Sequence, residues 1–119
     1  MLTLTASNRT MSSTLPDSSI NAFLASASGR RCSAMIGERA ALGLLRSVYR
    51  ACTATMPTLS RTRKHASRDL CGAAYWAPLS RGLMSCAGLC IAFLVKRQDL
   101  PLRLHKTRSG KGSKTYWLK

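Results

Sequence analysis

A Gly- and Lys-rich segment near the C-terminus, SGKGSKT from Ser109 to Thr115, is similar to a phosphate-binding loop. Such loops hold phosphate with the backbone N–H groups of a Gly-rich turn followed by Gly-Lys-Ser/Thr. Ser113 stands before Lys114 where the motif needs Gly, and the four residues after Thr115 are too few for the helix whose N-terminus would bind the phosphate. We therefore expect a basic tail here and no nucleotide site.

Thiols and imidazoles are the other groups that could do chemistry. Cys86 and Cys90 are four residues apart, which would place both thiols on one face of a helix. A structural zinc site needs four N or S ligands, and only His65, His105 and scattered cysteines could complete one. Cys71 and His65 have no orienting carboxylate at a recognisable spacing. The sequence thus predicts no metal, no cofactor and no catalytic activity.

Net charge is the most informative feature of the chain. Nineteen Lys and Arg against four Asp and Glu give a formal charge of +15 in 119 residues. Self-repulsion of this size is relieved by an anionic partner. An anionic membrane surface is the partner we expect, and nucleic acid is the alternative, because both present dense phosphate. The sequence identifies no protein partner.

The composition allows one modest domain with a limited core. Leu, Ile, Val and Phe make up about a fifth of the chain, which is the boundary below which highly charged chains tend to remain unfolded. The five cysteines are an odd number without a repeating spacing, which favours a reducing intracellular compartment over secretion. We accordingly expect a protein that is not secreted.

The N-terminal half divides into an arm and a helix. Residues 1–29 are rich in Ser, Thr and Ala and are expected to form a disordered arm. Residues 30–56 predict a basic amphipathic helix, because Arg39, Arg46 and Arg50 fall within ~40° of one another at 100° per residue while the apolar residues lie opposite. Gly37 and Gly43 each weaken this helix by ~1 kcal/mol relative to Ala.

The remaining segments are a basic linker over 57–72, an apolar segment over 73–97 and a basic tail over 98–119. Cations of the linker and of the C-terminal flank of the apolar segment join the three arginines of the helix as candidate contacts to anionic lipid or nucleic acid. Those candidates are Arg39, Arg46, Arg50, Arg61, Arg63, Lys64, Arg68, Lys96 and Arg97. A solvated charged loop is the simpler interpretation of the linker, since basic runs are common in a chain this cationic.

The apolar segment has two interpretations. From Pro78 to Val95 it would span about 27 Å as a helix, against a hydrocarbon core of ~30 Å. The pair Tyr75-Trp76 and the pair Lys96-Arg97 flank it as membrane anchors would. The alternative is a buried helix that pairs with residues 34–54 in a helical hairpin. Sequence alone leaves a membrane insert and a core helix equally open.

One short resemblance bears on location. The segment LLRSVYR, from Leu44 to Arg50, resembles the Leu-Tyr-Arg signature that opens the first helix of small basic mitochondrial assembly factors, with Val48 in place of the Leu. This resemblance slightly favours a mitochondrial location.

We therefore predict a mostly α fold with two loosely associated helices at about 33–55 and 78–96. The function that fits best is a small, basic, membrane-associated interaction protein without catalytic activity, either single-pass or interfacial. The alternative is an RNA-binding protein that uses the linker cations for phosphate and Tyr116-Trp117 for base stacking. The third alternative is an open reading frame product with no selected function, since local signals agree only in part.

Overall fold

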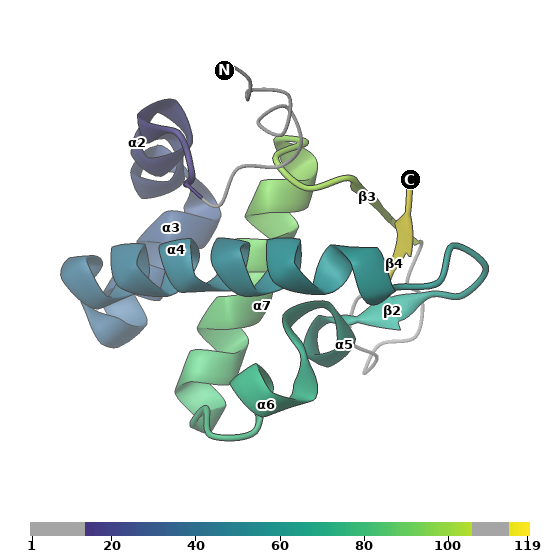
Figure 1. Ribbon diagram of the computed structural model, residues 1–119. Coiled ribbons are helices and arrows are strands. Elements are labelled where there is room, and N and C mark those ends of the chain that lie inside the picture. The colour runs from purple at the N-terminus through teal and green to yellow at the C-terminus, as the bar shows by residue number, and fades with distance from the viewer. Residues whose placement is uncertain (1–13, 106–114) are drawn as a thin grey trace, which may run out of the picture.

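The computed structural model describes residues 14–105 and 115–119, and these residues confirm the mostly α class (Figure 1). The helices are α2 Asp17–Ala25, α3 Ala27–Ile36, α4 Glu38–Thr55, α5 Ser67–Cys71, α6 Ala73–Trp76 and α7 Arg81–Lys96, with a 3₁₀ turn at Met56–Thr58. The strands are β2 His65–Ala66, β3 Leu102–Leu104 and β4 Thr115–Leu118. They form a small antiparallel sheet in the order β2-β4-β3.

The long helix expected over 30–56 is divided in two at Gly37. This residue has φ +93°, a backbone conformation that residues with a Cβ rarely adopt. The chain therefore turns between α3 and α4, and the basic amphipathic part is α4. Gly43, by contrast, lies within α4 and is accommodated there.

The expected disordered arm is wrong from Asp17 onward, because α2 and the start of α3 occupy that segment. Ile20 and Phe23 are buried on one side of α2, and the Phe23 ring meets the Phe93 ring of α7 edge to face at 5.0 Å between centroids. Ser26 caps α3, since its hydroxyl oxygen accepts a hydrogen bond from the Gly29 N–H at 2.9 Å. The segment was predicted to be disordered because its composition is rich in Ser, and its few apolar residues gave no periodic pattern.

The apolar segment forms a buried core helix, α7, but this helix crosses α4 and does not form the expected hairpin with it. In Figure 1 α7 passes behind α4 and crosses it, and α3 packs against both helices. The face of α7 that contains Cys90, Ile91 and Leu94 is fully buried, as is the face of α4 that contains Leu45 and Val48. The helices thus share one continuous core and are not loosely associated.

The helix boundaries also differ from the expected membrane insert. The helix begins at Arg81, not at Pro78, because the Ser80 hydroxyl caps it by accepting a hydrogen bond from the Leu83 N–H at 3.2 Å. Among the described residues, no helix combines the length and the apolar character needed to cross a bilayer.

The predicted linker and tail are partly structured because they pair with each other. His65 pairs with Tyr116 and Ala66 pairs with Thr115, which joins the linker to the last strand. Leu102 pairs with Leu118 on the other side of that strand. Buried Leu70, Leu100, Leu102 and Tyr116 attach this sheet to the helical core.

Candidate functional site

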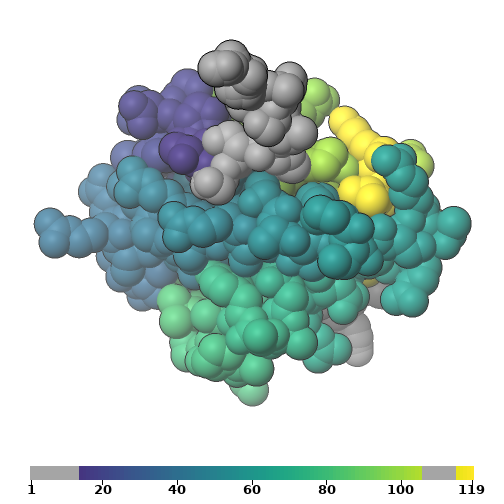
Figure 2. All heavy atoms as spheres, viewed as in Figure 1, coloured from purple at the N-terminus to yellow at the C-terminus, as the bar shows by residue number. Residues whose placement is uncertain are grey.

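The three predicted cations of α4 form a row on its solvent side. Arg39, Arg46 and Arg50 are all exposed, whereas the opposite face of the helix is packed in the core. From the first to the last of them α4 advances about 16 Å, at 1.5 Å per residue. In Figure 2 this helix crosses the visible face of the molecule as a continuous band. The row is therefore presented on a rigid element.

The linker cations form a second group on the turn that precedes β2. Arg61, Arg63 and Lys64 are exposed in the loop that projects beside the sheet (Figure 1). The Arg61 guanidinium donates a hydrogen bond to the carbonyl oxygen of Lys119 at 3.0 Å, which ties this loop to the end of β4. These residues are near each other in sequence, and Arg61 lines a pocket with Thr53 at the end of α4.

Arg68 shares a groove with a cation that the sequence did not single out. It lines a groove of about 600 Å³ between α5 and α7, and Arg81 lines the same groove. Trp76, Ser85 and Gly88 contribute to its walls. The two arginines are thirteen residues apart in the chain, so only the packing of α5 against α7 reveals the pair.

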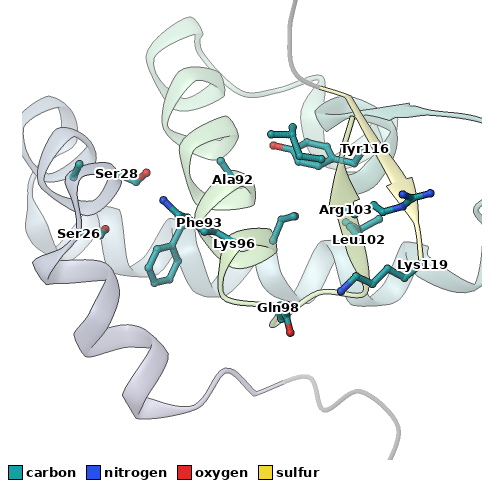
Figure 3. A pocket seen from close by; sticks show the side chains of 13 residues that line it. Ser26, Ser28, Ala92, Phe93, Lys96, Gln98, Leu102, Arg103, Tyr116 and Lys119 are labelled. Carbon is teal, nitrogen blue, oxygen red and sulfur yellow. The ribbon is translucent and has the colours of Figure 1, made fainter. Parts of the chain in front are cut away.

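Lys96 and Arg97 stand at the C-terminal end of α7, but they differ in their surroundings. The Arg97 guanidinium contacts the Asp99 carboxylate at 3.5 Å and lies 6.0 Å from the centre of the Phe93 ring, so it already has partners within the protein. Lys96 lines a cavity of about 570 Å³, together with two further cations, Arg103 and Lys119. This cavity lies between α3, α7 and β3 (Figure 3). We call it the α7 cavity.

The few acidic residues leave the basic surface unneutralised. Asp17, Glu38 and Asp69 each lie in the first turn of a helix, where a negative charge interacts favourably with the helix dipole. Asp99 accepts a hydrogen bond from the buried Ser19 hydroxyl at 2.8 Å and pairs with Arg97. Within residues 14–105 and 115–119, the Arg97–Asp99 contact is the one ion pair.

Tyr116 borders both the groove and the α7 cavity. Its side chain is 1% exposed, and its hydroxyl has no hydrogen-bond partner among the described residues. A buried polar group without a partner costs ~1–3 kcal/mol. Burial raises the pKa of this phenol to about 12, so the hydroxyl is a donor at neutral pH. The sequence indicated Tyr116 only as an exposed stacking residue, and its burial follows from the pairing of β4 with β2 and β3.

The cysteines form two buried sets in the core. The Cys52 and Cys71 sulfurs are 3.9 Å apart, and the Cys32 thiol donates to the Cys86 carbonyl oxygen at 3.6 Å. Hydrogen bonding from the Cys90 thiol lowers the pKa of Cys32 to about 7 despite burial, whereas burial raises the pKa of Cys86 to about 11.

All five thiols are free and buried. In the described part of the chain, no group of three or more His, Cys, Asp or Glu is arranged to hold a metal ion.

The predicted base-stacking pair is not available as expected. Tyr116 is buried, and the Trp117 indole N–H donates to His105 Nδ1 at 3.2 Å. The other chemical motif, SGKGSKT, lies outside the described residues except for Thr115. His65 and Cys71, which the sequence did not favour as a nucleophilic pair, have separate partners: His65 Nε2 contacts the Ser60 carbonyl oxygen at 2.8 Å, and the Cys71 sulfur contacts that of Cys52.

Comparison with protein-family models, with curated proteins and with solved structures finds no match, so the chemistry of these surfaces rests on this chain's own residues.

Proposed function

We propose that this protein attaches, without catalytic activity, to an anionic membrane surface inside the cell, and that the row of arginines on α4 is its principal contact. The observation that carries this proposal is the exposure of Arg39, Arg46 and Arg50 on one side of a helix whose other side is anchored in the core. A basic residue held near an anionic bilayer contributes about 1 kcal/mol to binding. Three such residues therefore supply about 3 kcal/mol.

Attachment through headgroups fits this fold better than insertion of α7. The apolar faces of α4 and α7 pack against each other and against α3. Among the described large apolar side chains, only Met35 and Leu104 are strongly exposed, at 47% and 52%. Electrostatic contact with phosphate uses the surface as it is folded and leaves the core intact. An intracellular site, with mitochondria favoured, remains our proposal for location and is supported by the five free thiols.

The test compares two variants with the same loss of charge. In the first, Arg39, Arg46 and Arg50 are replaced by Gln, and in the second, the linker residues Arg61, Arg63 and Lys64 are replaced by Gln. Sedimentation with vesicles of phosphatidylcholine and phosphatidylserine should show a loss of partitioning on the order of 100-fold for the α4 variant, which is 3 kcal/mol at 1.36 kcal/mol per decade. The linker variant should lose much less.

Two outcomes would overturn the proposal. Equal losses in the two variants would mean that net charge, not the α4 row, determines binding. Failure of the unaltered protein to sediment with anionic vesicles at ~0.1 M salt, where the screening length is ~10 Å, would remove membrane attachment itself.

Nucleic acid is the second candidate, and the groove between α5 and α7 favours it. Arg68 and Arg81 line this groove with Trp76, which is the combination of cations and an aromatic side chain that single strands use. If RNA is the ligand, Trp76→Ala should weaken binding of a single-stranded oligonucleotide, and affinity should fall linearly with salt on logarithmic axes. Competition between oligonucleotide and vesicles decides which ligand the protein prefers.

A further inference from the structure

The α7 cavity has the features of a small-molecule site. Its volume of about 570 Å³ lies within the ~300–1,000 Å³ that such sites occupy. Three separate parts of the chain line it, namely the start of α3, the last turns of α7 and the β3–β4 pair. These parts are joined to one another through the buried core.

The walls of this cavity are largely apolar. Ala92 and Val95 of α7 and Leu102 and Leu104 of β3 contribute them. Leu104 is 52% exposed, although its neighbour Leu102 on the same strand is buried. A hydrocarbon chain that binds in the cavity would cover this exposed Leu, and the burial of apolar surface would favour binding.

The polar groups of the cavity are all suited to an anion. Lys96, Arg103 and Lys119 line it, and no Asp or Glu does. The Tyr116 hydroxyl is an unused donor that is excluded from solvent. Figure 3 shows the Tyr116 ring reaching from β4 toward Ala92 on α7, with its oxygen at the end nearer that helix. A phenol donates well to a carboxylate or a phosphate.

From these observations we infer that the α7 cavity binds a single-chain amphiphile with an anionic headgroup, such as a long-chain carboxylate or a lysophosphatidate. The headgroup accepts a hydrogen bond from the Tyr116 hydroxyl and is neutralised by Lys96. The acyl chain covers Val95, Leu102 and Leu104. This site is distinct from the α4 row and does not depend on attachment to a membrane.

The experiment measures displacement of dansyl-labelled undecanoic acid from the full-length protein without vesicles, with every lipid below its critical micelle concentration. Laurate and lysophosphatidate should both displace the probe. Inorganic phosphate and acetate should not, because they lack the chain. Displacement by inorganic phosphate at the same concentration as laurate would overturn the assignment of an amphiphile.

Matched variants locate the site. Tyr116→Phe keeps the ring and should weaken laurate binding roughly tenfold, since one hydrogen bond to a charged group is lost. Tyr75→Phe removes a hydroxyl that is bonded to Ser47 away from the cavity, and it should leave the affinity unchanged. Lys96→Gln should weaken binding severalfold, whereas Arg39→Gln, with the same change of charge, should not.

The inference is wrong if Tyr116→Phe binds laurate as tightly as the unaltered protein, or if Tyr75→Phe loses as much affinity. It is also wrong if laurate fails to displace the probe. Loss of vesicle binding in the α4 variant, with laurate affinity retained, would support both proposals separately.

Discussion

Replacing a glycine by alanine should have opposite effects at two positions of this fold. A Cβ at Gly29 would lie 1.7 Å from the Phe23 carbonyl oxygen and 2.6 Å from its carbon, so the end of α2 would have to move by more than about 1 Å. That oxygen accepts hydrogen bonds from the Ser26 hydroxyl at 2.7 Å and from the Ser26 N–H at 3.0 Å. The displacement would therefore weaken two hydrogen bonds to this oxygen, each of which contributes ~1 kcal/mol to stability.

The displacement would also disturb the contact between the rings of Phe23 and Phe93. Together with the ~1–3 kcal/mol that an overpacked site costs, we expect Gly29→Ala to lower the free energy of unfolding by about 2–4 kcal/mol. At Gly43 the added Cβ would meet no atom within 4 Å apart from its chain neighbours and the backbone of its own helix, and the residue is exposed within α4. Gly43→Ala should therefore raise the free energy of unfolding by ~0.5–1 kcal/mol.

Urea unfolding, followed by tryptophan fluorescence and far-ultraviolet circular dichroism, measures both changes. With an m-value of ~1–3 kcal/mol/M, the midpoint should fall by roughly 1–2 M for Gly29→Ala and rise by a few tenths for Gly43→Ala. An unchanged midpoint for Gly29→Ala would refute the close approach of α2 to α3. A lowered midpoint for Gly43→Ala would refute the exposed helical environment at that residue.

Three further predictions concern thiols, pH and capping. Mild oxidation with diamide, which accepts two electrons and two protons, should join Cys52 to Cys71 first, because their sulfurs are 3.9 Å apart, and peptide mapping without reductant would reveal another first pair if this is wrong. Burial raises the pKa of Cys86 to about 11 and that of Tyr116 to about 12. Above about pH 9 these two groups ionise in the unfolded chain before they ionise in the folded one, so the free energy of unfolding should fall as the pH rises. Below about pH 9 both groups are neutral in both states and should not affect stability. Urea midpoints against pH test this, and Tyr116→Phe should reduce the fall. Ser80→Ala should lower stability by ~1 kcal/mol and Ser80→Gly by only a few tenths, and equal losses would argue against the α7 cap.

Helical periodicity was sufficient to predict the two longest helices. The apolar side of α4 repeats at Ala41, Leu44, Leu45 and Val48, and all four are buried. The apolar run of α7 likewise predicted a helix close to its observed bounds. Local patterns of this kind depend on neighbours three and four residues away, so they can be seen without a tertiary structure.

The parts that sequence failed to predict depend on distant partners. In α2 only Ile20 and Phe23 are buried apolar residues, and the Phe23 contact with Phe93 spans most of the chain. The strand β2 has two residues, and its pairing of His65 with Tyr116 joins segments about fifty residues apart. Neither segment has a periodic pattern long enough to be distinguished from a loop.

The same distinction applies to the candidate sites. The row on α4 followed from helical geometry, and the exposure of its three arginines matches that geometry. Arg81, Arg103, Lys119 and the Tyr116 hydroxyl could not be selected, because their neighbours in the groove and in the α7 cavity come from other elements. Lys and Arg are common in this chain, and only the tertiary surroundings of each one distinguish a residue of a candidate site from the others.

The apolar run from Arg81 to Lys96 shows why the composition underestimated the core. Large aliphatic residues are few, but Cys32, Cys86 and Cys90 are fully buried, and Ala41 and Ala87 are buried with them. A reduced cysteine behaves as a small apolar residue, and small residues let helices approach closely. The face of α7 that a membrane insert would expose to lipid is thereby packed against α3 and α4.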